Sequence, residues 1–490
     1  MLQYLSHQQP STLVGYLTVV LPALFLAYTL QSYWRLRRIP GPFWAKFSNL
    51  SRTSWVWSRR AHDIHIELHR KNGKLVRFGP NMVSCADPGE IANVYGFSGK
   101  YRKSRFYQVI LPMSKGKILP GLFATQDEDM HRMLKKPIAS IYSMSNLVSF
   151  EALVDQTIHC FFEQLDTRFA NEQKAFDFGA WLQMFAFDVV GEITFSKRLG
   201  FLEKGEDVGN IMGDIWKYFQ YVAPVGQMPW IDSLWVKNPF ISMLRKPSWS
   251  PMGDFAMARQ NERMKLMQSD YVLSEKEKGN PRDFLSRFIE ALAKDKNVPQ
   301  WALLAWTQSN ITAGSDTTAI LLRTIFYHLL KHPSTLHVLL TELRTASKSG
   351  NISDIVTWKQ SRELPYLDAC IKEAGRIHPP FGLPLERIVP DEGAEISGEY
   401  LPGGTIVGMN AWVVHRDTEV FGHDADVWRP ERWLAKDAGD ETRVKRMDNS
   451  LLTIELEDPN KEWKVENRWF VPQFDFNVVL KRRENWPFDG

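Results

Sequence analysis

The stretch Leu364–Pro380 reads LPYLDACIKEAGRIHPP and sets Glu373 three residues before Arg376. Positions i and i+3 share one face of a helix, so the two side chains can form a local ion pair. This spacing alone is weak evidence, because it recurs by chance about twice in a chain of this size. Further along, the segment 426–433 reads DVWRPERW and supplies Arg432, which can complete a buried network of one acid and two arginines.

A second motif lies inside residues 299–330, a long and largely apolar run that predicts a helix buried on most sides. The sequence AGSDTT at 313–318 interrupts this run. A glycine at mid-helix costs about 1 kcal/mol relative to alanine, and hydroxyl groups can bond back to the preceding turn, so we expect the helix to widen or bend here. Small residues let a flat cofactor approach the backbone, and an acid beside an alcohol can relay protons into an apolar site; the alternative is a polar kink that faces solvent. The candidate site residues are Ala313, Gly314, Asp316 and Thr317.

The composition is that of an ordinary globular protein, with 490 residues, 44% hydrophobic and 24% charged, which excludes disordered and fibrous classes. A formal charge of +4, from 60 Lys+Arg and 56 Asp+Glu, is too dilute for a nucleic-acid-binding surface, so we expect no nucleic-acid partner. The three cysteines, at positions 85, 160 and 370, have no paired spacing. This argues against a disulfide framework or a structural zinc site, and we predict no metal-ligating cluster.

The N-terminus carries no charged residue before Arg35, and Thr12–Leu30 is apolar over roughly the length that a bilayer-spanning helix needs. Three arginines follow at once, which by the positive-inside bias leaves the rest of the chain in the cytosol. A cleaved signal peptide is disfavoured because its positive charge would precede the apolar run. A buried helix of a soluble protein is the alternative. The predicted segments are a translocated N-terminus at 1–11, a transmembrane signal anchor at 12–34 and a basic, proline-rich hinge at 35–45.

The remaining residues, 46–490, have mostly helical patterns with short strands between them and no internal repeat. Residues 74–78 and 82–85, separated by Gly79-Pro80-Asn81, predict an early hairpin. The expected fold is therefore mainly α with small β-sheets, as one large helical domain preceded by the N-terminal transmembrane helix.

These motifs, in this order, resemble the cytochrome P450 family, and the likeness runs from the N-terminal helix to the last strand. Short sequence motifs such as WVVHRD at 412–417 are similar to those of the filamentous-fungal branch that includes pisatin demethylase. The resemblance implies haem b as cofactor, an NADPH-cytochrome P450 reductase as partner, an apolar small molecule as substrate, and a single-pass place in the endoplasmic reticulum membrane. By the same resemblance, Asp316 and Thr317 form the proton-delivery pair. Glu373, Arg376 and Arg432 form the structural triad. His131, Lys135 and Arg387 contact the haem propionates.

The family's activity depends on a cysteine thiolate bound to the haem iron. Its signature, Phe-x-x-Gly-x-Arg-x-Cys-x-Gly, follows the segment that carries Arg432, yet no cysteine occurs from Arg432 to Gly490. The sequence resembles the family on both sides of a point between about 447 and 456. The loop and the helix whose positive end faces the thiolate, about 35 residues by resemblance, therefore look absent as one internal deletion.

None of the cysteines present is expected to replace that ligand. Cys85 stands at the right distance from Phe78 but lies in the predicted hairpin, and Cys160 and Cys370 are most simply small buried residues. Loss of a core helix also predicts an impaired fold, because it removes more apolar burial than a net stability of about 5–15 kcal/mol can absorb. The leading hypothesis is a monooxygenase of fungal secondary metabolism that is inactive or impaired as written, in one version a mis-spliced product of a competent gene. The alternative is a haem-free, membrane-anchored relic or small-molecule-binding protein.

Overall fold

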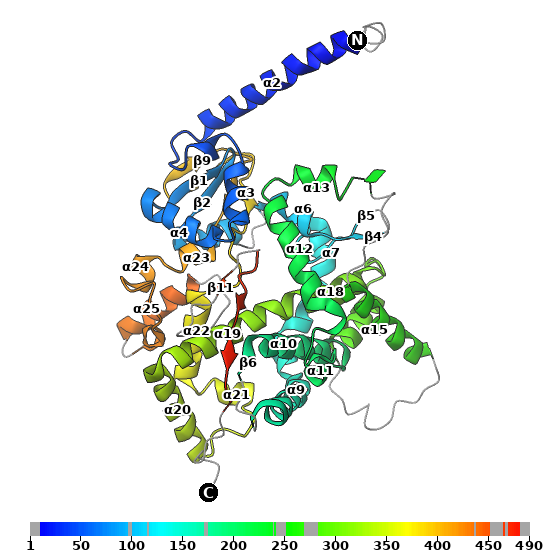
Figure 1. The fold of residues 1–490 in the computed structure, drawn as a ribbon, viewed down its shortest axis with the longest axis vertical. Coiled ribbons are helices and arrows are strands. Elements are labelled where there is room, and N and C mark those ends of the chain that lie inside the picture. The colour runs from blue at the N-terminus through cyan, green and yellow to red at the C-terminus, as the bar shows by residue number, and fades with distance from the viewer. Residues whose placement is uncertain are drawn as a thin grey trace.

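The computed structural model describes residues 10–96, 100–114, 117–170, 175–238, 240–241, 251–268, 283–435, 438–450, 464–465 and 469–480. These residues form a mainly helical body with small sheets, which confirms this part of the predicted fold class (Figure 1). The helices used below are α2 (Pro10–Arg35), α3 (Leu50–Trp57), α4 (Ala61–Asn72), α6 (Phe106–Ile110), α7 (Glu128–Lys135), α9 (Glu151–Leu165), α10 (Phe178–Phe195), α11 (Phe201–Lys204), α12 (Ile211–Val225), α15 (Pro251–Gln268), α17 (Phe284–Lys294), α18 (Ala302–Gly314), α19 (Asp316–Lys331), α20 (Pro333–Lys348), α22 (Pro365–Ile377), η6 (Pro430–Trp433) and α25 (Ala438–Asn449).

The largest sheet joins distant parts of the chain in the order β1-β2-β10-β7-β3. β1 and β2 form the predicted hairpin, antiparallel with Val76 opposite Ser84, and β10 adds to β2 in parallel. Figure 1 shows this sheet with α3 and α4 in the lobe below α2. Its strands are β1 (Leu75–Gly79), β2 (Met82–Cys85), β3 (Arg102–Lys103), β7 (Arg387–Ile388) and β10 (Ile406–Gly408), and the two-stranded sheets pair β4 (Met113–Ser114) with β5 (Lys117–Ile118), β6 (Phe176–Asp177) with β13 (Asn477–Val478), β8 (Ala394–Ile396) with β9 (Glu399–Leu401) and β11 (Lys464–Val465) with β12 (Gln473–Phe474).

Helix α10 is the centre of the helical body because most of its residues are apolar, so most of its faces can be buried. It packs against α9, α18 and α19. Asp177 caps its first turn by accepting a hydrogen bond from the backbone N–H of Ala180 at 2.9 Å. The buried carboxylate of Asp188 accepts three backbone N–H groups at the start of α11 at 2.8 to 3.3 Å. Asp188 is therefore satisfied, and it fixes the turn that follows the helix.

The long helix predicted over 299–330 is present but interrupted, because α18 ends at Gly314 and α19 begins at Asp316. The hydroxyl groups of Ser315 and Thr317 donate to backbone carbonyl oxygens four residues back, at 2.8 and 2.6 Å. These are the bonds that the sequence predicted would bend the helix.

Gly314 has a packing reason to be glycine. A Cβ at this position would lie 2.8 Å from Cγ2 of Val190 on α10, which is closer than packed atoms approach. Our sequence interpretation gave this glycine to the approach of a flat cofactor. The structure adds a second reason, the close approach of α10 to α18, and the role toward a cofactor stays a prediction.

Helix α2 covers the predicted anchor, and its last turn is bound to the body. Among the helices in the described ranges, none is long and apolar enough to cross a membrane. The transmembrane helix predicted at 12–34 is therefore not supported. Ser32 is buried near the end of α2, and the buried Arg77 of β1 donates to the carbonyl oxygens of Ser32 and Tyr33 at 2.8 and 3.2 Å. Of the predicted translocated N-terminus, residues 1–9 lie outside the described residues.

Replacing Arg77 by methionine should loosen the end of α2. Arg77 also donates to the carbonyl oxygens of Lys46, Gly79 and Pro80. Methionine fills much of the volume but leaves buried acceptors without donors, so we expect a loss of about 2–4 kcal/mol in the free energy of unfolding, measured by urea denaturation. The exposed Arg102 on β3 provides a control, for which Arg102→Met should change stability by less than about 0.5 kcal/mol. Equal losses in the two variants would contradict this role.

Candidate active site

Glu373 is the centre of a buried charge network. Its carboxylate accepts hydrogen bonds from Arg376 at 2.8 Å on each oxygen and from Nε of Arg432 at 3.0 Å, and all three side chains have no exposed surface. The indole N–H of Trp433 and the backbone N–H of Arg429 each add a bond at 2.9 Å. The structure thus brings the predicted triad together between α22 and η6. Trp433 was missed by sequence reasoning, although it directly follows Arg432.

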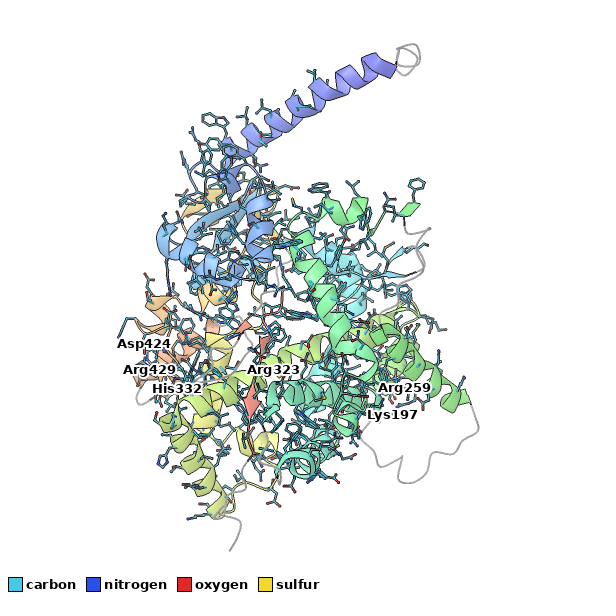
Figure 2. The ribbon with its side chains drawn as sticks, viewed as in Figure 1. Lys197, Arg259, Arg323, His332, Asp424 and Arg429 are labelled. Atoms are coloured by element: carbon cyan, nitrogen blue, oxygen red, sulfur yellow. The ribbon has the colours of Figure 1, made fainter. Side chains whose placement is uncertain are left out.

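The two guanidinium groups are also held by backbone. Burial by itself raises the pKa of Glu373, but the charge and hydrogen bonds of Arg376, with the charge of Arg432, outweigh it and lower that pKa. Asp424 and Arg429, at the edge of the network, form an ion pair at 3.0 Å (Figure 2). Arg376 and Arg432 donate at 2.9 to 3.2 Å to the backbone carbonyl groups of His415, Asp424 and Val427.

Glu373→Gln should strongly destabilise the chain. It leaves two buried guanidinium groups without their counter-charge, which costs about 3–5 kcal/mol of unfolding free energy. Because the folded pKa of Glu373 is lowered, its contribution is complete above its unfolded pKa and is lost as the pH falls through the folded value. Urea denaturation at pH 7 and at decreasing pH measures both effects, and the gap between native and variant should narrow in acid. A pH-independent gap would contradict the ionic role.

Asp316, the first residue of α19, is connected to α10. It accepts a hydrogen bond from Nε2 of Gln183 at 2.6 Å, and Oε1 of Gln183 accepts one from Arg323 at 2.9 Å. The buried Arg323, labelled in the middle of the body in Figure 2, also donates to the carbonyl oxygens of Gly179 and Gln473 at 2.8 and 3.0 Å. Sequence reasoning missed this relay. An arginine two turns after Asp316 in an apolar run was a signal for the Arg323 end of the relay, but nothing in the sequence pointed to Gln183.

The position of Asp316 suits an acid that titrates near neutral pH. Desolvation raises its pKa to about 6, against the opposing effects of the Gln183 hydrogen bond and the charge of Arg323. Thr317 is buried, Gly314 is half-buried and Ala313 is exposed. Consecutive residues thus supply a carboxyl group and a hydroxyl group at the break between α18 and α19, and such groups can hold or pass on a proton.

Asp316→Asn should stabilise the chain above pH 6. A carboxyl group with a raised folded pKa is bound to its proton more tightly in the folded state, so ionisation removes stability as the pH rises between the unfolded and folded values. Asparagine keeps the acceptor for Gln183 and carries no charge. Because Asp316 is only half-buried as a residue, we expect a gain of about 1–2 kcal/mol at pH 8 that disappears near pH 4. Thermal unfolding at the two pH values measures it, and an equal or lower stability at pH 8 would contradict it.

The three residues predicted to hold the haem propionates lie near a lysine that the sequence did not reveal. Lys103 is directly opposite Arg387 in the pairing of β3 with β7. Burial, followed by the charges of Arg387 and Lys135, lowers the pKa of Lys103 to about 8, although Glu128 opposes this. Burial and then the charge of Lys103 lower the pKa of His131. This cationic group, defined as Lys103, His131, Lys135 and Arg387, has the charge that propionate carboxylates require.

The cysteines do not fit the other requirement of a haem-thiolate site. Cys370 is fully buried among apolar side chains of α19, α20 and α22, and burial raises its pKa. Cys85 is buried on β2, where burial raises its pKa to about 11. Cys160 lies on α9, and its pKa is also raised, first by burial. A thiolate ligand needs a lowered pKa and access to the iron. The residues present fit the carboxylates of haem and do not fit its axial thiolate.

The predicted deletion falls at the edge of the described residues. α25 ends at Asn449, and residues 451–463 lie outside the described part, so most of the interval from 447 to 456 does too. The side chain of Met447 is buried, which shows that α25 is packed against the body up to the point where the sequence predicts the loss.

Comparison with known proteins agrees with this arrangement of helices, sheet and charge network. The family model for cytochrome P450 matches residues 38–448. A cytochrome P450 monooxygenase of Aspergillus terreus is 57% identical over 449 residues, covering 91% of this chain and 89% of that protein. Cytochrome P450 monooxygenase cicH of Emericella nidulans is 49% identical over 94% of this chain and 97% of its own length. Cytochrome P450 monooxygenase asR2 of Sarocladium schorii is 41% identical over 96% and 97%.

The chain belongs to the cytochrome P450 family, and its relatives are fungal monooxygenases. Family membership implies haem as the cofactor. The alignment with asR2 runs over 500 residues yet covers 96% of a chain of 490, so the relative carries residues within the matched span that this chain lacks. The finer assignment to the pisatin demethylase branch stays a prediction.

Proposed function

We propose that this chain comes from a monooxygenase of fungal secondary metabolism that oxidises an apolar small molecule, and that the chain as written lacks this activity. The observation that carries the second part is the position of the three cysteines. Each lies in a packed helix or strand with a raised pKa, so none can serve as the thiolate ligand. Haem would supply oxygen activation in a competent relative, and no step through it is derived for this chain.

An aromatic cluster supports an apolar ligand. The rings of Phe106 and Phe381 lie 4.7 and 5.5 Å from that of Trp469, centroid to centroid, and Tyr107 lies 5.6 Å from Phe123. These side chains come from α6 and from the segments before α7, β7 and β12, and they form one aromatic cluster of which Phe123 is the exposed member. An aromatic cluster favours flat, apolar molecules over charged ones.

A haem-free binding protein is the second candidate. Tyr107 links the aromatic cluster to the cationic group, because its hydroxyl accepts a hydrogen bond from Arg387 at 3.1 Å. An apolar molecule that carries a carboxylate would suit both parts without any haem. The two candidates differ in whether thiolate-bound haem is ever formed.

A reduced carbon-monoxide difference spectrum separates the two candidates. We expect no Soret band of the thiolate type from the purified chain, because a thiolate ligand is missing. Inserting the corresponding segment of cicH between Met447 and Leu456 should restore the band, and replacing the inserted cysteine by serine should remove it again. A thiolate-type band from the chain as written would contradict the proposal. Failure of the restored chain to give the band would favour the haem-free protein.

The origin of the deletion is tested on the transcript. If the chain is a mis-spliced product of a competent gene, sequencing across Met447 to Leu456 should find additional codons for the cysteine loop. An uninterrupted message without them would contradict this version and make the loss a true deletion.

The proposal also covers the source of electrons for a competent form and the location of that form in the cell. We infer that a competent form receives electrons from an NADPH-cytochrome P450 reductase and works on the cytosolic side of the endoplasmic reticulum. Cell fractionation with a protease-protection assay tests the location. Recovery in the lumenal, protease-protected fraction would contradict it.

A further inference from the structure

Glu386 is a buried acid that joins two other elements. Its carboxylate forms an ion pair with Arg52 of α3, with side-chain exposures of 5% and 6%, and accepts a hydrogen bond from the hydroxyl of Ser104. Ser104 directly follows β3 and is fully buried, and Glu386 directly precedes β7. The carboxylate therefore connects the ends of two paired strands to a helix.

The strands it connects carry like charges opposite each other. Lys103 faces Arg387, and each strand is only two residues long. Like charges at directly opposite positions destabilise strand pairing, and two residues supply few ladder hydrogen bonds. Among the described residues, neither Lys103 nor Arg387 has an ion pair of its own. Something other than the ladder must keep β3 and β7 together.

We infer that Glu386 is a positioning residue, whose bridge between Arg52 and Ser104 holds β3 against β7 and thereby keeps Lys103 and Arg387 side by side as the core of the cationic group. Arg52 supplies the counter-charge that lets the carboxylate stay buried. Removing the carboxylate takes away the acceptor for the Ser104 hydroxyl and leaves Arg52 as a buried cation without its ion pair. The short pairing of β3 with β7 then opposes the repulsion between Lys103 and Arg387 without this bridge.

The titration of Lys103 distinguishes positioning from simple charge compensation. Burial lowers its pKa first and Arg387 second, while Lys135 lowers it and Glu128 raises it; His131 is the other titratable neighbour. If the strands separate, burial and the repulsion by Arg387 both weaken, so the pKa of Lys103 rises. If Glu386 acts only as a nearby negative charge, its removal lowers the pKa of Lys103. The two roles predict opposite signs.

The test compares Glu386→Gln with Glu395→Gln, the same change at an exposed acid on β8, in the full chain without haem. The pH profile of acylation of each lysine by acetic anhydride is followed by peptide mass spectrometry, and each rate is expressed relative to its plateau at high pH. For Glu386→Gln we expect the relative rate of Lys103 at pH 8 to fall about fivefold or more, and for Glu395→Gln to stay unchanged. A rise or no change in Glu386→Gln overturns the inference.

Ser104→Ala keeps the experiment decisive if Glu386→Gln does not fold. It removes only one hydrogen bond from the bridge and leaves the ion pair with Arg52 in place. We expect a smaller fall of the same sign in the relative rate of Lys103, and an unchanged rate overturns the inference. The inference does not rest on the proposed function, since it concerns the apo chain and stands even if no haem is ever bound.

Discussion

The structure depends on one buried carboxylate that holds two buried guanidinium groups. Charges without exposed surface are stable only when they are paired and hydrogen-bonded, and Glu373 meets this condition for Arg376 and Arg432 together. The same guanidinium groups also bind backbone carbonyls between residues 415 and 427. Helix α22 and the segment up to η6 are therefore fixed relative to each other by polar geometry. Apolar packing alone would allow them to slide.

Polar contacts between residues that are close in the sequence could be predicted, and contacts between distant residues could not. The Glu373–Arg376 pair is three residues apart on one helix, and the hydroxyl bonds at the α18–α19 break are four residues apart, so both could be predicted. The roles of Gln183 and Lys103 could not be predicted. Gln183 binds Asp316 and Lys103 lies opposite Arg387, and in both cases the partner is in a distant part of the chain. The hairpin of β1 and β2 was predicted because its strands are joined by a short turn. Parallel addition of β10 was not.

The N-terminal helix makes a contact that its apolar pattern does not reveal. Near its end, the carbonyl groups of Ser32 and Tyr33 accept hydrogen bonds from Arg77, which lies in a strand more than forty residues later. No periodicity within the helix reveals this contact. Gly314 is similar, since its close contact with Val190 comes from a distant part of the chain.

The site therefore has the acid and the cationic residues expected of the family but no cysteine suited to bind the haem iron. Asp316 is held at a half-buried position where ionisation costs stability, which is typical of residues kept for function. The cationic group has the charge for the carboxylates of haem. No cysteine has the position or pKa of an axial ligand. The proposed loss of activity therefore leaves the charge network between α22 and η6 in place.

Hydrogen exchange of the full chain tests this central claim most directly, because it measures whether the network holds without the missing segment. Peptides that cover 365–377 and 424–433 should exchange as slowly as those that cover 178–195 in α10, and much more slowly than those that cover 438–449 in α25. If residues 365–377 exchange as fast as α25 while α10 stays protected, the Glu373 network does not organise the fold of this chain, and the account is wrong.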